Sequence, residues 1–283
     1  MRNTAYRSLW GNLIITIILI LVAIFMALPL VYSIMNAFKP LDELFLFPPR
    51  FFVRRPTLKN FTDLFYLMGT SFVPFSRYIF NSIFVSFLGT LGHVLIASMA
   101  AYPLAKNKFP GSNFLFNLVI FSLMFSGYVT NIPRFIIMAK LRLLDSYFAL
   151  ILPYIGATLG LFLMKQFMEQ IPDSYIESAR IDGANEFKIW WYVVMPNVKP
   201  AWLTLILFAF RDIWNDSYSP SLYIHNEALK PFSLALSYIQ QGGFVRAGAS
   251  AAAAVLMLLP SIIIFIITQS NVMETMKSAG IKG

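Results

Sequence analysis

The stretch at residues 13–35, LIITIILILVAIFMALPLVYSIM, decides the class of fold, because it runs for 23 residues without a charged side chain. A helix needs about 20 apolar residues to cross the hydrocarbon core of a bilayer. The stretch is too long for the apolar core of a signal peptide, and no small-residue cleavage site follows it. It therefore predicts an anchoring helix, which we place at residues 12–37.

The composition extends this conclusion to the whole chain. Hydrophobic residues make up 58% of it and charged residues only 12%, where soluble domains carry about a quarter charged residues. The net charge of +9 comes from basic residues scattered between apolar runs, so we expect membrane lipid, and no nucleic acid, as their partner. The chain has no cysteine, which excludes disulfides and thiolate metal sites. The fold class is thus predicted to be an all-α integral membrane protein.

Five further apolar stretches bring the predicted number of spans to six. They cover residues 77–105, 112–134, 145–169, 200–224 and 247–273. Pro260 is expected to kink the last one. The fifth is apolar for only ten residues before Arg211, so a re-entrant or interfacial segment is the alternative there. The spans are joined by two long segments, 38–76 and 225–246, and by 170–199, with tails at 1–11 and 274–283.

The orientation of the spans is weakly encoded. Basic residues divide evenly between the two sides, ten on each. Arg2 and Arg7 precede the first span without nearby acids, whereas Lys39 after it is offset by Asp42 and Glu43. The positive-inside rule therefore favours both termini in the cytoplasm. Residues 38–76, which contain five prolines, would then form an external segment of irregular structure with short helices, and 225–246 a second external loop.

The 170–199 segment would face the cytoplasm and holds the most specific pattern. Ser174 and Glu177 have the spacing of a capping box, with Asp173 as a competing N-cap, and a short helix is predicted at 175–181. Gly183 permits a turn that residues with a Cβ resist, and a second helix is predicted at 184–194. On these features alone, an amphipathic pair resting on lipid is as plausible as a segment that docks another protein.

The string ESARIDGA at 177–184, followed by VVMP at 193–196, resembles the EAA loop of ABC importer permeases. That pattern reads Glu-Ala-Ala, three residues, Gly, nine residues, Ile, one residue, Leu-Pro, and the spacing matches throughout. Ser178, Val193 and Met195 depart from it by small or apolar replacements. The Asp-Gly-Ala form, the Trp-Asn-Asp of the fifth span and the C-terminal tail are similar to the sugar-transporting branch, closest to the smaller six-helix permease of maltose-type transporters.

This resemblance implies a type I ABC importer permease fold in the cytoplasmic membrane of a prokaryote, with a cytoplasmic coupling helix. It implies that Glu177 meets a basic residue of a separate ATPase and that Gly183 forms the turn. The ATPase-coupling residues it implies are Glu177, Ser178, Ala179, Asp182, Gly183, Ala184 and Pro196.

The source of energy must lie in another protein. The chain has no Gly-Lys pair and hence no P-loop, so ATP and Mg are expected on the partner ATPase, and no cofactor, metal or enzymatic activity in this chain. The resemblance implies a second homologous permease, two ATPase subunits, an external solute-binding protein and an oligosaccharide substrate. Residues 38–76 are a candidate surface for the binding protein.

Ionisable groups inside the fifth span are candidates for the translocation path. Such groups are costly at membrane depth and usually face a cavity. Asp212 and Asp216 are spaced i,i+4 and would share a helix face, while Trp214 could stack on a sugar. The alternative for Arg211 is a structural pair with a carboxylate on a neighbouring helix. The predicted path residues are Arg211, Asp212, Trp214, Asn215 and Asp216.

The substrate and two other function classes stay open. Basic residues in 38–76 could favour an acidic oligosaccharide of the uronate type, such as alginate or pectin fragments, or could meet an acidic binding protein or lipid headgroups. An ion-coupled secondary transporter is the alternative function, although internal repeats typical of that class are not evident. A membrane enzyme would need a catalytic acid constellation, for which Asp212 and Asp216 alone are thin support.

Overall fold

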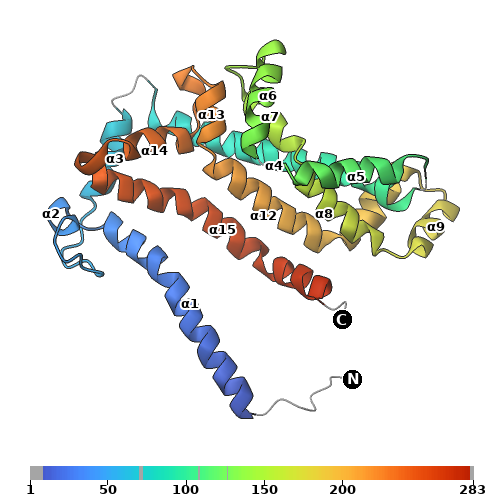
Figure 1. Cartoon of the computed structure of the whole chain (residues 1–283), viewed down its shortest axis with the longest axis horizontal. Helices are drawn as coiled ribbons and strands as arrows, with labels where there is room; N and C mark the ends of the chain where they lie inside the picture. The colour runs from blue at the N-terminus through green and yellow to red at the C-terminus, as the bar shows by residue number, and fades with distance from the viewer. Residues whose placement is uncertain (1–8, 70–72, 108, 126, 281–283) are drawn as a thin grey trace. The chain divides into compact units, whose positions relative to one another are not determined.

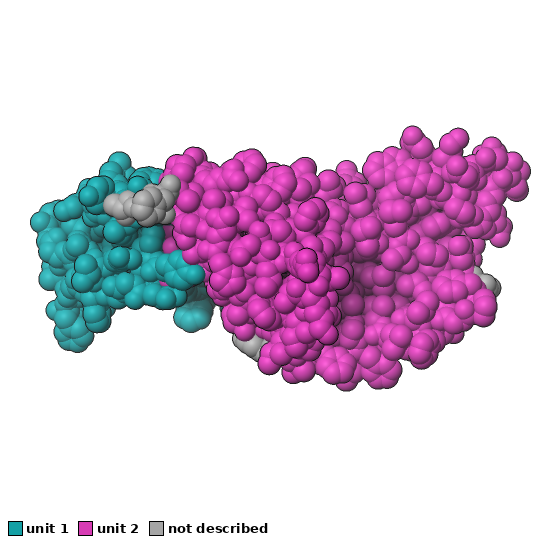
Figure 2. Space-filling model, turned by 90° about the horizontal axis from the view of Figure 1, so that it is seen from above, with its two compact units in different colours: residues 1–70, 238–256 teal, residues 71–237, 257–283 magenta. Residues whose placement is uncertain are grey.

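The computed structural model describes residues 9–69, 73–107, 109–125 and 127–280, and all regular structure in these ranges is helical (Figure 1). The chain divides into two compact units, coloured separately in Figure 2. Unit 1 comprises residues 1–70 and 238–256, and unit 2 comprises residues 71–237 and 257–283. The predicted tail residues 1–8 and 281–283 lie outside the described residues.

Unit 1 begins with α1, Leu9–Ala37, where the sequence predicts the first span. Two short helices follow in the segment expected to be irregular, α2 (Leu41–Leu44) and α3 (Lys59–Gly69). The side-chain amide of Asn60 donates hydrogen bonds to the carbonyl oxygens of Ala37, at 2.9 Å, and Lys39, at 2.7 Å. This buried amide therefore fastens α3 to the end of α1.

Buried charges organise the loop between α2 and α3. The Lys39 side chain is buried, and its ammonium donates to Asn36 Oδ1 at 2.7 Å. The Glu43 carboxylate is also buried and accepts the main-chain N–H of Arg54 at 2.8 Å. Arg50 and Arg54, by contrast, are exposed. The loop thus keeps its positive side chains on the surface while internal hydrogen bonds fix its course.

Unit 2 is built on three helices that pack together: α4 (Phe75–Lys106), α8 (Thr158–Glu169) and α12 (Lys199–Asn215) (Figure 1). Glycine makes the close approach possible. A Cβ added at Gly160 of α8 would lie 2.3 Å from His93 Nε2 on α4. Because core atoms already fill this space, a larger residue there would push the two helices apart.

The predicted third span, 112–134, is broken. The chain forms α5 (Ser112–Leu123) and then α6 (Gly127–Lys140). The N–H of Met124 bonds to Phe121 O at 3.0 Å, a tight i→i−3 closure that ends α5. Glycine is a poor residue for a helix interior, so Gly127 opens the next helix instead of continuing the first. With 12 residues, α5 alone is shorter than a spanning helix.

Two other predicted spans are also interrupted. The fourth consists of α7 (Tyr147–Ile155) and α8, and still forms one apolar stretch of 23 residues. In the fifth, α12 stops at Asn215 and the short α13 (Tyr218–Tyr223) follows.

The last predicted span lies within α15, Ala247–Gly280, which begins in unit 1 and continues in unit 2. The preceding segment 225–246, expected as a loop, contains η2 (Glu227–Leu229), α14 (Phe232–Gln240) and η3 (Gly243–Arg246). By length and composition, the described residues hold four spanning helices, or five if a bent pair described below counts as one. Six were predicted, and the broken third stretch accounts for part of the difference.

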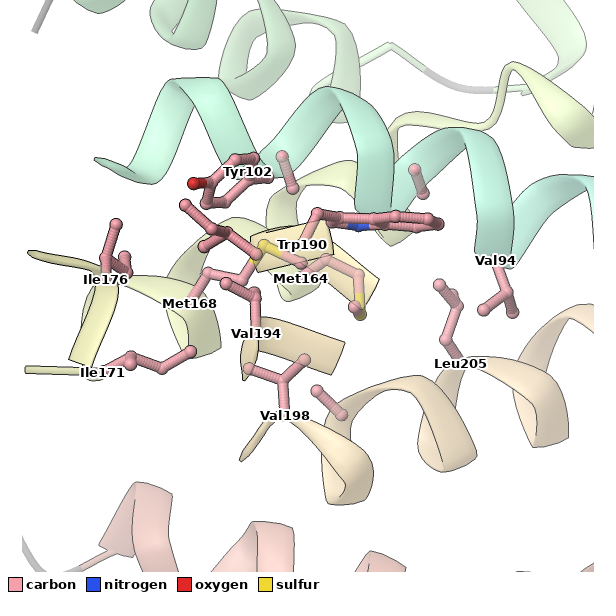
Figure 3. Packing of buried hydrophobic residues seen from close by; sticks show 14 residues of the cluster. Val94, Tyr102, Met164, Met168, Ile171, Ile176, Trp190, Val194, Val198 and Leu205 are labelled. Atoms are coloured by element: carbon pink, nitrogen blue, oxygen red, sulfur yellow. The ribbon is translucent and has the colours of Figure 1, made fainter. Parts of the chain in front are cut away.

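A hydrophobic cluster fills the end of unit 2 near α9 (Asp173–Ile181) (Figure 3). Figure 3 shows Tyr102 of α4, Met164 and Met168 of α8, and Ile176 of α9 converging with Trp190. All five side chains are buried. Apolar packing therefore holds one face of α9 against the spanning helices.

Candidate functional site

The turn of the 170–199 segment is closed by a glycine, as the sequence predicts. Gly183 has a φ of 82°, and its N–H bonds to Arg180 O at 3.0 Å, while the N–H of Ala184 bonds to Ala179 O at 3.0 Å. This pair of bonds is a Schellman motif, which ends α9. An added Cβ at Gly183 would meet nothing within 4 Å, so the backbone conformation alone demands glycine.

The predicted capping box at the start of α9 is wrong. The helix begins at Asp173 directly after Pro172, and no side chain caps it. Ser174 therefore lies inside the first turn, where its carbonyl oxygen accepts the Ser178 hydroxyl at 2.8 Å. Asp173 instead pairs with the Lys106 ammonium at 2.8 Å. The fixed φ of Pro172 starts the helix two residues earlier than the Ser-x-x-Glu spacing suggests.

The second part of the segment is one helical rod with an irregular centre. Asn185 caps it by accepting the Lys188 N–H at 2.9 Å. The rod comprises α10 (Glu186–Lys188), the π-helix η1 (Ile189–Val194) and α11 (Met195–Asn197). It then bends by 83° into α12. We call residues 173–197 the elbow.

The elbow presents a mixed acidic and apolar surface. Glu177 and Gly183 are exposed, as are Ile181 at 86% and Phe187 at 61% of their full areas. The sequence reasoning did not single out Ile181, although its i,i+4 spacing from Glu177 places both on one helix face. Of the other predicted coupling residues, Ser178, Asp182 and Pro196 are exposed, and Ala179 and Ala184 are half-buried.

Polar side chains tie the elbow to α4. The Tyr102 hydroxyl donates to Glu186 Oε2 at 2.6 Å, and Arg180 Nε donates to Glu186 Oε1 at 3.0 Å. The hydrogen bond from Arg180 to Glu186 raises the pKa of the guanidinium above its usual value. Lys106 also reaches the carbonyl oxygen of Ile171. The charged groups of Arg180 and Glu186 on the elbow, and of Lys106 on α4, therefore all have hydrogen-bond partners.

A polar cavity of about 570 Å³ lies at the other end of α12. It is lined by Tyr154, Arg211, Asp212, Asn215, Asp216, Ser219, Leu258 and Ser261. Arg211 and Asp212 are exposed to it, and within the described residues their side chains make no hydrogen bond or ion pair. The described chain therefore offers Arg211 no carboxylate partner of the kind that the structural alternative requires.

Asp216 is the last residue before the chain leaves the helix. It caps α12 with a ψ of 115° and lines the same cavity as Asp212. Its carboxylate accepts the Tyr154 hydroxyl at 2.6 Å and the N–H groups of Tyr218, at 2.9 Å, and Ser219, at 3.0 Å. Asp216 thus stabilises the break in the helix while one edge of it lines the cavity.

The structure separates Trp214 from Asn215. The Trp214 indole is buried and donates from Nε1 to Met257 O at 3.1 Å. Asn215 is exposed, and its amide donates to Arg211 O at 2.8 Å. Sequence reasoning missed Tyr154, Ser219 and Ser261, which come from other elements. The buried Ser261 hydroxyl has no partner among the described residues.

Nothing in the described part of the chain resembles a metal centre, since no group of three or more His, Cys, Asp or Glu side chains is close enough to hold an ion. The candidate sites on the described chain are the exposed surface of the elbow and the polar cavity.

Two known proteins are similar in sequence to this chain over most of its length. Protein LplC of Bacillus subtilis (strain 168) is 37% identical over 217 residues, covering 75% of this chain and 70% of LplC. The polygalacturonan/rhamnogalacturonan transport system permease protein YtcP of the same organism is 33% identical over 221 residues, covering 78% of this chain and 75% of YtcP.

The fold has a counterpart among solved structures. The crystal structure of a bacterial ABC transporter involved in the import of the acidic polysaccharide alginate superposes with a TM-score of 0.78. The match covers 94% of this chain and 99% of that chain at 22% identity, a likeness of fold. The family model for the inner membrane component of binding-protein-dependent transport systems matches residues 10–273. The chain therefore belongs to this family of transport components, and it is a membrane permease rather than an enzyme.

Proposed function

We propose that this chain is a permease subunit of an ATP-driven ABC importer for oligosaccharides. It forms half of the translocation path beside a second homologous permease. Two ATPase subunits bind on the cytoplasmic side, where both termini also lie, and an external solute-binding protein delivers the substrate. The carrying observation is the elbow, whose Gly183 turn leaves Glu177 and Ile181 exposed on one surface.

The elbow is suited to receive another protein. Its inner face is fixed by the buried Ile176, Ile189 and Trp190, so the outer face is presented on a rigid support. A large exposed isoleucine beside a carboxylate gives both an apolar contact and a charge for orientation. The matching surface on an ATPase would be an apolar cleft with a basic residue for Glu177.

The cavity at the end of α12 is our candidate for part of the translocation path. A sugar combines hydroxyl groups with apolar C–H faces, so it needs donors and acceptors that are not already engaged. The exposed Arg211 and Asp212 supply such groups within one cavity. Facing a second permease, this cavity would close around part of the substrate.

An oligosaccharide containing uronates is the substrate that we favour. The related YtcP is named for polygalacturonan and rhamnogalacturonan transport, and the alginate importer handles another acidic polysaccharide. Exposed Arg50 and Arg54 on unit 1 and Arg211 in the cavity offer positive charge. Neutral arabino-oligosaccharides are the second candidate, because the related AraQ proteins are named as permeases for them.

Docking is tested by purifying the complete transporter with the elbow altered. Glu177→Lys and Ile181→Asp should each reduce the amount of ATPase that copurifies with the permease pair, and should reduce sugar uptake. Leu58→Ser, which removes an apolar side chain that is also exposed but lies before α3, is the matched control and should leave ATPase binding unchanged. Normal ATPase binding in both elbow variants would contradict the proposal.

The substrate class is tested with the solute-binding protein of the same transporter. Its affinity for galacturonate and mannuronate oligomers should exceed its affinity for arabino-oligosaccharides of equal length. Uptake into proteoliposomes should follow the same order. A preference for the neutral sugars would exclude the uronate class while leaving the importer function intact.

A further inference from the structure

The turn of the elbow has no side chain packed over its glycine. Gly183 is exposed, has a positive φ, and has no atom within 4 Å of the place where a Cβ would stand. Among the described residues, the two Schellman hydrogen bonds hold its conformation, together with the packing of Ala179 and Ala184 against the apolar cluster. Force applied to the exposed face of α9 would therefore open the angle between α9 and the following rod, unless another contact spans the turn.

Glu186 supplies a contact across the turn. Its carboxylate lies after Gly183, while the guanidinium of Arg180, its partner, lies before it. Arg180 Nε and Nη2 both approach Oε1 of Glu186, at 3.0 and 2.9 Å. Both side chains are about half exposed, so solvent screening keeps the contribution of the pair modest. The pair nevertheless bridges the turn and adds to its backbone hydrogen bonds.

The same carboxylate also reaches a spanning helix. Its second oxygen, Oε2, accepts the hydroxyl of Tyr102, a residue of α4 that is only 5% exposed. In the described residues that hydroxyl has this carboxylate as its hydrogen-bond acceptor. A buried hydroxyl without an acceptor is unfavourable, so the contact favours one position of the elbow relative to α4.

A second tie lies beside the first. The Lys106 ammonium, at the last turn of α4, contacts Asp173 Oδ1 at 2.8 Å and the carbonyl oxygen of Ile171. Lys106 thus holds the beginning of α9 and Tyr102 holds the region beyond its end. Both ties come from α4.

We infer that Glu186 is a positioning residue that locks the elbow across the Gly183 turn and onto α4. A push on the exposed face of the elbow then moves α4 instead of opening the turn. This inference rests on the proposed docking of an ATPase to the elbow, and it adds which side chain passes the motion on and which helix receives it.

The test compares variants of Glu186 in the complete reconstituted transporter. Glu186→Ala should keep the ATPase bound, lower sugar uptake about tenfold and raise the ATP hydrolysed per sugar, because charge-assisted contacts of this kind are lost together. Tyr102→Phe should give the same pattern with a smaller loss. Glu169→Gln is the matched control, since that carboxylate pairs with Lys165 inside α8, and it should behave as wild type.

Rescue separates positioning from general damage. Glu186→Gln keeps the size of the side chain and can still accept from Tyr102, so it should recover part of the uptake. The double exchange of Arg180→Glu with Glu186→Arg restores a pair across the turn and should transport better than either single change. Equal loss in the double exchange would overturn the inference.

A distance measurement reads the elbow directly. The chain has no cysteine, so spin labels can be placed at Asn107→Cys and Lys188→Cys without removing native thiols. Glu186→Ala should broaden the distance distribution between the labels, and the control Glu169→Gln should not. An unchanged distribution would overturn the inference. Loss of ATPase binding in Glu186→Ala would also overturn it, whereas normal binding in Glu177→Lys and Ile181→Asp would instead contradict the docking proposal.

Discussion

Polar side chains near the two ends of α12 differ in whether other side chains engage them. At the elbow, Glu186 and Lys106 are each engaged by two or more partners. At the cavity, Arg211 and Asp212 lie exposed, and no side-chain partner is found for them in the described residues. Engaged groups fix the geometry of a joint, whereas unengaged groups in a cavity are free to bind a ligand. Under the proposed function, α12 would connect the end that docks the ATPase to the end that binds the sugar.

The comparison has one exception. The indole Nε1 of Trp190, in the centre of the elbow, is buried and has no acceptor among the described residues. Its neighbours are apolar side chains of the cluster in Figure 3, so it contributes packing rather than a polar tie.

The largest effect is expected at the turn of the elbow. Gly183→Val would force a β-branched residue to a φ of 82°, a conformation that costs L-residues about 1–2 kcal/mol or more. Since 1.4 kcal/mol changes an equilibrium about tenfold, uptake should fall by about five- to thirtyfold. Transport of labelled sugar into proteoliposomes measures it.

Gly183→Asn is the matched control, because asparagine tolerates left-handed backbone and there is room for its side chain. It should keep most of the activity. If the valine and asparagine variants were equally active, the claim that transport depends on the left-handed turn at Gly183 would be contradicted.

The next largest effect concerns the cavity. Arg211→Ala should lower uptake about five- to tenfold, the range expected when a ligand hydrogen bond worth about 1 to 1.4 kcal/mol is lost, and leave assembly of the transporter unchanged. Lys140→Ala, an exposed cation at the end of α6, should have no effect on either. Copurification of all subunits checks assembly, and failure to assemble would return Arg211 to a structural role.

A smaller effect should distinguish two neighbours in sequence. Trp214→Phe removes the hydrogen bond to Met257 O, so stability should fall by about 1 kcal/mol while the apparent affinity for sugar stays the same. Asn215→Ala should lower the apparent affinity for sugar and leave stability unchanged. Thermal unfolding and concentration-dependent uptake, measured on both variants, check this pair. A change of sugar affinity in Trp214→Phe alone would place the indole in the path after all.

The smallest effect is expected at Asp145, a hydrogen-bonded carboxylate that belongs to neither the elbow nor the cavity. Asp145 accepts the N–H groups of Asn226, at 2.8 Å, and His225. These bonds, with Asn226 first and the nearby His225 side chain adding to them, hold the pKa of Asp145 below its usual value of 3.8. A carboxylate with a lowered folded pKa stabilises above the unfolded pKa, and the gain disappears as pH falls through the folded value.

Asp145→Asn should therefore lower the unfolding temperature slightly at pH 5 to 7, and the difference from wild type should shrink as the pH falls below about 4 and disappear only below the lowered pKa of the folded protein. Thermal scans across this pH range check the sign. A difference that grows as the pH falls would show that the bonds to Asn226 and His225 do not set the stability of this loop.

Sequence reasoning reached the helical membrane class and the turn at Gly183, because long apolar runs and a glycine between two helices each have one physical explanation. It failed where helices break inside apolar sequence. Gly127 and Asp216 interrupt predicted spans, and neither break is visible from hydropathy, which is averaged over many residues. The Asp216 break depends on Tyr154, a residue of another helix.

The same limit applies to the candidate sites. Arg211 and Asp212 were found because charges inside an apolar span are unusual. Glu186 was not singled out, since an acid in an amphipathic segment is ordinary until Tyr102 is placed beside it by the fold. Ile181 was missed for a related reason, because only the burial of the opposite face shows that this isoleucine is exposed.

The π-helix η1 gives the elbow an unusual phase. Trp190, Val194 and Val198 recur every four residues and are all buried, a repeat wider than the 3.6 residues of an α-helix and suited to the wider π turn. A π turn holds one more residue than an α turn. Removing a single residue from η1 should therefore convert it to an α-helical turn and end the four-residue repeat that buries Trp190, Val194 and Val198. The width of this one turn thus decides which side chains of the rod enter the apolar cluster.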